Sequence, residues 1–165
     1  MDPKAYIAGK RVLIVDDEKD VLDSLSTLLD MCKVDTALTF EEGKRLLEDS
    51  VYDIAILDIM GVQGFELLEI AIRRNVPALM LTAHGLSEEN LRRSAEEGAS
   101  YYAPKEEMSN IATFVADVLE AREKNKSPWI RWSERLTSFY DRRFGGKDWR
   151  EKEKEFWEKR IKAID

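Results

Sequence analysis

The 165-residue sequence contains one cysteine, one histidine and four prolines. A single cysteine, Cys32, excludes an intrachain disulfide and any zinc site that is built from several cysteines. No apolar run approaches the roughly 20 residues that a membrane-spanning helix needs. Residues 1–10 are of mixed character and show no signal-peptide pattern. We therefore expect a cytoplasmic protein without a membrane span.

The charges are unevenly distributed along the chain. The sequence is 44% hydrophobic and 36% charged, which is typical of a globular domain. Residues 1–125 carry 14 Lys and Arg against 25 Asp and Glu, whereas residues 126–165 carry 12 against 8. The contrast indicates two parts with different tasks. The acidic part argues against nucleic acid as its ligand, because phosphate backbones bind basic surfaces.

One short stretch organises the sequence. In 53–58 (DIAILD), four apolar residues in succession run into Asp58. Such a run predicts a strand buried on both faces, and a free carboxylate would be costly inside a core. The strand must therefore end at Asp58, on a rim that water or a cation can reach. The earlier run 12–15 (VLIV) ends in the same way, at Asp16 and Asp17.

The remaining chain alternates between short apolar runs and amphipathic segments. We expect strands at 11–15, 34–38, 54–57, 77–81 and 100–103. A helix of about 14 residues should follow the first strand, by its 3.6-residue period. Thr39 and Ser87 are expected to cap two further helices, and others should cover 65–72 and 108–119. Alternation of this kind predicts an α/β doubly wound parallel sheet with helices on both faces.

Polar side chains leave the carboxyl ends of four of these strands. They are Asp16 and Asp17, then Asp58, Thr82 and Lys105. Parallel sheets bind ligands at this edge. Carboxylates in one pocket repel one another unless a cation is present, and Mg²⁺ prefers such oxygen ligands. An aspartate can also attack phosphorus and form an acyl phosphate, and we expect Asp58 to be that nucleophile.

Four pieces of the chain resemble the receiver domain of two-component response regulators. They are 12–18 (VLIVDDE), 55–58 (AILD), 79–83 (LMLTA) and 98–105 (GASYYAPK), within roughly residues 9–123. Each piece alone is a weak signal, but four in order at strand ends make a strong one. The resemblance implies a flavodoxin-like fold with strand order 2-1-3-4-5. It also implies that a sensor histidine kinase or a phosphotransfer protein donates a phosphoryl group to Asp58.

The resemblance further implies a metal site. Asp17 and Asp58 would hold Mg²⁺ directly, together with the backbone carbonyl of Met60, and Asp16 would act largely through water. Two features depart from the family's pattern. Gly64 follows Asp58 after six positions instead of the usual eight, with no intervening proline, and Glu106 replaces the proline that usually follows Lys105.

Four other residues receive roles from the resemblance. Thr82 would turn toward the phosphoryl group, and Lys105 would pair with it. Tyr102 would rotate inward as a switch, although plain packing explains it equally well. His84, two residues beyond Thr82, would lie over the pocket mouth and tune the lifetime of the phosphoryl group. An ordinary loop histidine is an equal alternative.

Residues 126–165 are expected to form a separate helical extension to a receiver at 1–125. Ser127 and Asp148 are expected N-caps, and 145–146 (GG) separates two aromatic stripes. The stripes contain Trp129, Trp132, Leu136, Phe139 and Tyr140, and then Trp149, Phe156, Trp157 and Ile161. The expected object is a helical hairpin that packs on the receiver, on itself or on a second subunit.

The preferred function is a phosphorylation-switched signalling module, with output to an unknown protein partner or through a homodimer. We do not expect a turnover enzyme. Phosphatases that use an aspartate nucleophile normally carry a second aspartate two residues later, and Met60 stands there. A degenerate receiver that acts as a constitutive scaffold is the alternative.

Overall fold

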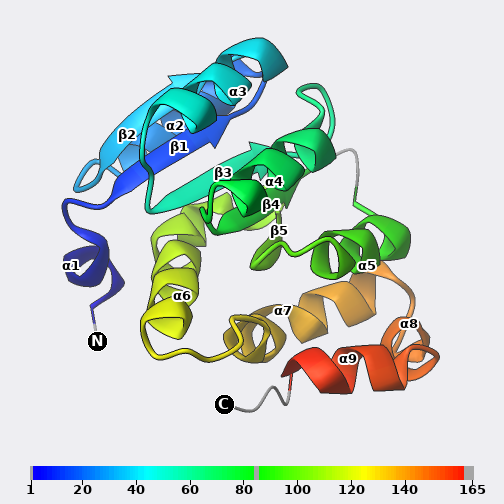
Figure 1. The fold of residues 1–165 in the computed structure, drawn as a ribbon. Helices are drawn as coiled ribbons and strands as arrows, with labels where there is room; N and C mark the ends of the chain where they lie inside the picture. The colour runs from blue at the N-terminus through cyan, green and yellow to red at the C-terminus, as the bar shows by residue number, and fades with distance from the viewer. Residues whose placement is uncertain (1, 84–85, 162–165) are drawn as a thin grey trace.

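The structure, a computed structural model, describes residues 2–83 and 86–161. Within them, five parallel strands form one sheet in the order β2-β1-β3-β4-β5. The strands are β1 (Arg11–Val15), β2 (Lys33–Ala37), β3 (Ile54–Asp58), β4 (Ala78–Thr82) and β5 (Tyr101–Pro104) (Figure 1). The predicted doubly wound sheet and its strand order are thus confirmed.

The strand register brings the predicted site residues to one edge of the sheet. Every residue of β3 and β4 is buried, as expected for strands covered on both faces. Val15 pairs with Leu57, and Asp58 pairs with Leu81. Asp16, Asp58 and Thr82 therefore follow or end adjacent strands at the same level.

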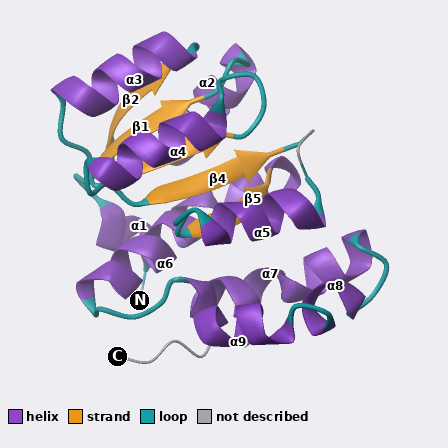
Figure 2. Cartoon of the chain, turned by 45° about the vertical axis from the view of Figure 1, so that its right-hand side comes forward, coloured by secondary structure: helices purple, strands orange, loops and turns teal. Residues whose placement is uncertain are grey.

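Five helices connect or follow these strands in the described part of the chain. They are α2 (Lys19–Leu28), α3 (Phe40–Asp49), α4 (Gly64–Arg73), α5 (Glu88–Glu96) and α6 (Ile111–Glu123). Helices α3 and α4 pack together on one face of the sheet, and α2 contacts α6 on the other (Figures 1 and 2). The predicted caps are confirmed, because Thr39 Oγ1 accepts from the Glu42 amide and Ser87 Oγ from the Asn90 amide. Helix α2 has 10 residues, so the expected length of about 14 was too long.

Two short elements were not expected from the sequence. Helix α1 (Pro3–Ile7) begins after Asp2, whose carboxylate accepts a hydrogen bond from the Lys4 amide at 3.1 Å. It packs against α6 and buries Ile7 completely. The second is a 3₁₀ helix, η1 (Lys105–Asn110), which follows β5 directly. None of the helices in the described ranges combines the length and the apolar character needed to cross a membrane.

The C-terminal tail, defined here as residues 126–161, forms α7 (Trp129–Arg143), α8 (Asp148–Glu151) and α9 (Lys154–Ile161). Figure 2 shows these helices as a layer beside α5 and α6. The second half of the predicted hairpin, with its stripe from Trp149 to Ile161, is therefore divided into α8 and α9. The expected cap at Ser127 was wrong by one residue, because Pro128 holds the cap position of α7, although Ser127 Oγ accepts from the Trp129 amide at 3.2 Å. The expected cap at Asp148 was wrong, because Asp148 is the first residue of α8 and Lys147 holds the cap position.

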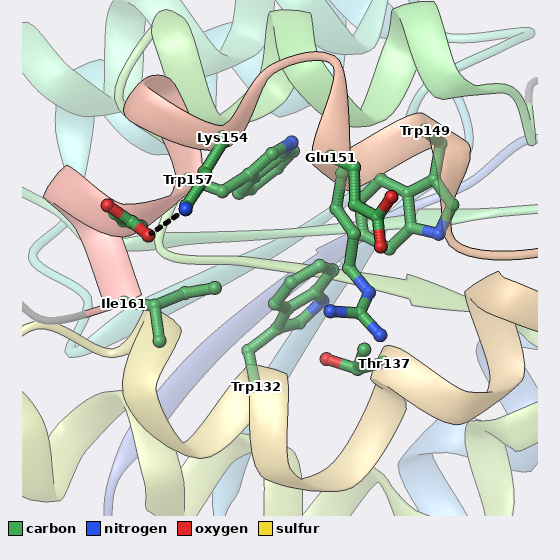
Figure 3. A pocket seen from close by; sticks show the side chains of 9 residues that line it. Trp132, Thr137, Trp149, Glu151, Lys154, Trp157 and Ile161 are labelled. Atoms are coloured by element: carbon green, nitrogen blue, oxygen red, sulfur yellow. Dashed lines mark ion pairs between the residues drawn. The ribbon is translucent and has the colours of Figure 1, made fainter.

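The aromatic stripes of the tail face inward. Trp132 is fully buried, and Trp129, Trp149 and Trp157 are each 4% exposed. The rings of Trp132 on α7 and Trp157 on α9 stack with centroids 5.5 Å apart, beside a cavity of about 500 Å³ (Figure 3). The tail thus packs both on itself and on the sheet domain, which are two of the three packing partners expected from the sequence.

Candidate functional site

Lys105 joins the acids at the carboxyl edge of the sheet. Its Nζ atom lies 2.9 Å from Oδ2 of Asp16, 2.9 Å from Oε1 of Glu18 and 3.3 Å from Oδ1 of Asp58. Asp16 and Asp58 are almost completely buried, and the Lys105 side chain is 10% exposed. Every peptide bond among the described residues is trans. Lys105 therefore reaches both buried acids although Glu106 replaces the family's proline.

One ammonium group does not balance these charges. Burial, and then the charge of Asp16, raise the pKa of Asp58 to about 7, while Lys105 acts in the opposite direction. Burial likewise raises the pKa of Asp16. Burial alone would lower the pKa of Lys105, but its contacts with Asp16 and Glu18 raise it above the usual range. The site therefore favours additional positive charge.

Three adjacent carboxylates can converge on one cation. Asp16, Asp17 and Glu18 each offer an oxygen, and these oxygens lie within 4.8 Å of one another. Oδ2 of Asp16 is buried and makes no hydrogen bond of good geometry in the described structure, although it pairs electrostatically with Lys105. A set made only of carboxylate oxygens fits a small, hard divalent ion such as Mg²⁺.

The composition of this cluster differs in part from the metal site that the resemblance implied. Asp16 and Asp17 belong to it, whereas Asp58 contacts the cluster through Lys105. Glu18 was not singled out in the sequence as a site residue. Its position directly after the paired aspartates was the available signal, and its amide also donates to Asp16 Oδ1 at 2.9 Å.

The loop after Asp58 closes tightly despite its short length. The Gly64 amide donates to the Ile59 carbonyl at 3.1 Å. Gly61 has a φ of +86°, and a Cβ atom there would lie 2.5 Å from Oδ2 of Asp17. A side chain at this position would be strained by the positive φ and would displace the Asp17 carboxylate, so the loop backbone lies directly against the acidic cluster. The Met60 side chain is 52% exposed, and its carbonyl belongs to this same loop.

The remaining site residues lie on β4 and β5. Thr82 is fully buried as the last residue of β4. Tyr102 is fully buried on β5, and burial raises its pKa above the usual range. Its hydroxyl accepts a hydrogen bond from the Ser87 amide at 3.3 Å. His84 lies outside the described residues.

Solved structures of known proteins share this fold. A CheY-like response regulator receiver domain from Methanospirillum hungatei matches with a TM-score of 0.65 and 31% identity, covering 71% of this chain and 98% of that one. The BeF3-activated DrrB receiver domain matches with a TM-score of 0.60 and 26% identity, covering 68% and 98% respectively.

Curated relatives include the two-component response regulator ARR18 of Arabidopsis thaliana, with 34% identity over 64% of this chain and 18% of that protein. They also include the transcriptional regulatory protein CpxR of Klebsiella pneumoniae, with 38% identity over 58% of this chain and 42% of that protein. This chain therefore matches less than half the length of these relatives. The family model of the response regulator receiver domain matches residues 12–116. Because this model covers more than half of the sequence, the chain belongs to the response regulator receiver family.

Proposed function

We propose that Asp58 accepts a phosphoryl group from a phosphohistidine of a sensor histidine kinase or of a phosphotransfer protein. The observation that carries the proposal is the shared contact of Lys105 with Asp16 and Asp58 at the end of β3. An oxygen of Asp58 forms the new bond to phosphorus, and the phosphorus–nitrogen bond of the donor breaks. The imidazole leaves with that electron pair and takes up a proton, so no further reactant is needed.

The chain's own side chains position the phosphoryl group. Lys105 pairs with a phosphoryl oxygen, and the Thr82 hydroxyl donates a hydrogen bond to another. Thr82 is suited to this role because Asp58 pairs with Leu81, its neighbour on β4. Phosphoryl transfer depends mainly on such positioning and on charge neutralisation. Tyr102 senses the change through its contact with Ser87. We also propose that His84 tunes the lifetime of the phosphoryl group on Asp58.

The metal-binding residues we propose are Asp16, Asp17 and Asp58, with the backbone carbonyl of Met60. A bound Mg²⁺ would neutralise negative charge on the phosphoryl oxygens. The convergent carboxylates of Asp16 and Asp17 support this assignment, and Glu18 adds a third oxygen donor to the same cluster.

We propose a receiver at 1–125, a separate extension at 126–165, and output by protein–protein interaction in the cytoplasm. The tail covers β5 and contacts α6 in the described structure, so a partner that approaches this side meets the outer surface of the tail first. The partner is a downstream protein or a second copy of the chain. Acidic residues 1–125 support a protein partner over nucleic acid.

The test is intact-mass measurement after incubation with Mg²⁺ and a small acyl phosphate, or with a phosphorylated kinase domain. We expect one phosphoryl group per chain in the wild type and none in Asp58→Asn. The matched control is Asp53→Asn, at the exposed position directly before the start of the same strand, which should still be modified. An unmodified wild type would favour the constitutive scaffold. Many turnovers on a phosphate ester would instead indicate a phosphatase.

A further inference from the structure

Tyr102 lies between the proposed phosphoryl site and the tail. On the site side, its hydroxyl contacts both backbone groups of Ser87, at 3.3 Å from the amide and 3.5 Å from the carbonyl oxygen. Ser87 caps α5, the helix that follows Thr82 along the chain. The position of Tyr102 is therefore tied to the start of α5.

On the tail side, two donors converge on the backbone of Tyr102. Its carbonyl accepts a hydrogen bond from Nε1 of Trp132 at 2.9 Å and one from the Tyr140 hydroxyl at 2.8 Å. The Tyr140 ring also packs on the Tyr102 ring, with centroids 5.7 Å apart. Trp132 and Tyr140 are both fully buried. The two hydrogen bonds therefore fix the backbone of Tyr102 against α7, and the Tyr140 ring packs beside its side chain.

The two donors are themselves held in place. Trp157 on α9 stacks on Trp132, and Trp149 meets Trp132 edge-on, with ring centroids 6.3 Å apart. Figure 3 labels these three side chains. Helix α7 is anchored to the receiver on both sides of Trp132. Nε1 of Trp129 donates to the Ala99 carbonyl, and Arg135 pairs with the buried Asp117. Because these two donors are held by close packing, they fix the position of the Tyr102 carbonyl and do not adapt to it.

We propose that Trp132 and Tyr140 are positioning residues for phosphorylation at Asp58, acting through Tyr102 and Ser87 on the start of α5, the helix that follows Thr82 along the chain. This inference rests on the proposed function and deepens it. A docked tail holds Tyr102 and the start of α5 in one arrangement before the phosphoryl group arrives. Preorganisation lowers the entropic cost of binding at the site. By linkage, occupation of the site must strengthen docking of the tail by the same factor.

The first test measures the affinity for beryllofluoride, an analogue of the phosphoryl group, in the presence of Mg²⁺ by fluorine NMR. The variants Trp132→Phe and Tyr140→Phe each remove one donor and keep an aromatic ring. We expect each to weaken binding about threefold to tenfold, the range for one lost hydrogen bond, and the double variant to weaken it further. Tyr102→Phe, which removes the hydroxyl that contacts Ser87, should act in the same direction.

The matched control is Arg143→Gln. It removes an ion pair between the tail and Glu106 on the surface but leaves Tyr102 untouched, so its affinity should equal that of the wild type. Melting curves recorded with a chelator establish that each variant is folded. Equal affinity of the double variant and the wild type would overturn the inference. A wild type that fails to bind beryllofluoride would instead overturn the proposed function.

The reciprocal measurement separates positioning from general stability. Hydrogen exchange in α7 should slow when Mg²⁺ and beryllofluoride are added to the wild type, because occupation of the site favours the docked tail. The same addition to Tyr102→Phe should leave exchange in α7 nearly unchanged, although the site is still filled at a higher concentration. Equal slowing in both proteins would show that the coupling does not pass through Tyr102.

Discussion

Asp16 and Asp58, the acids that follow or end two adjacent strands, share the ammonium group of Lys105, which lies 2.9 Å from one and 3.3 Å from the other. Both acids are buried, so each favours a further cation or a neutral partner. The balance between these charges sets the stability of the site before any phosphoryl group is present.

The variant Asp58→Asn should be more stable than the wild type in metal-free buffer near pH 8. The pKa of Asp58 is raised from 3.8 to about 7, so the folded protein holds the proton more tightly than the unfolded chain does. The penalty for the ionised group is therefore absent below about pH 4 and complete above about pH 7. Asparagine removes it, and we expect a gain of about 1–3 kcal/mol in the free energy of unfolding.

Chemical denaturation followed by circular dichroism measures this gain. Added Mg²⁺ should stabilise the wild type more than Asp58→Asn, so the difference between them should shrink. A variant that is less stable than the wild type without metal would contradict this account of the site.

Loss of the shared cation should have the opposite effect. Lys105→Gln leaves Asp16 and Asp58 buried with no ammonium between them, and we expect a loss of about 1–3 kcal/mol in metal-free buffer. Lys19→Gln is the control, because the Lys19–Asp23 pair is largely exposed and should contribute under about 1 kcal/mol. Equal melting temperatures of the two variants would disprove the importance of the buried contact.

The anchor of the tail on α6 can be tested separately. Asp117 is 4% exposed and accepts from Arg135 and from the Tyr101 hydroxyl. Arg135→Gln leaves this carboxylate partly unsatisfied and should cost about 1–3 kcal/mol. The double variant with Asp117→Asn should recover part of that loss, since the buried charge is then gone. No recovery in the double variant would mean that Arg135 acts mainly through packing.

Acid should weaken the packing inside the tail at one identifiable group. Asp141 accepts from Arg150 and from Nε1 of Trp149 at 2.8 Å, and these contacts lower its pKa below 3.8. A lowered pKa gives stability that is complete above the unfolded value and is lost as the pH falls through the folded value. Asp141→Asn should therefore be less stable than the wild type at pH 7, and the difference should vanish in acid.

Denaturation followed by tryptophan fluorescence between about pH 7 and pH 2.5 measures this difference, because the sequence places all four tryptophans in the tail. A difference that stays constant across this range would show that the charge of Asp141 plays no part.

The sequence was sufficient for the sheet and for the position of the candidate site. Short apolar runs that stop at Asp16 and Asp58 are typical of buried strands that end at a rim, and parallel strands bring those ends together. Thr82 and Lys105 could be placed at the same edge for the same reason. Helix α1 could not be predicted from periodicity, because it is five residues long and buries only Ile7.

Contacts between side chains that are distant in the sequence could not be predicted either. An aromatic stripe on α7 shows that one face is buried, but not which surface covers it, so docking on Tyr102 was one of several alternatives. The pairing of Asp117 with Arg135 joins two helices and has no local pattern. The contact of Glu18 with Lys105 likewise has no local pattern, because it depends on how β5 and η1 fold.

The partners of the tail have a consequence for how the chain folds. They come from one part of the chain: Ala99 and Tyr102 on or beside β5, Asp117 on α6, and Arg92 on α5, which pairs with Glu153. The sequence separations of these contacts run from 18 to 61 residues. Loop-closure entropy grows only slowly over such distances. The loops that docking of the tail closes therefore lie within the C-terminal half of the chain.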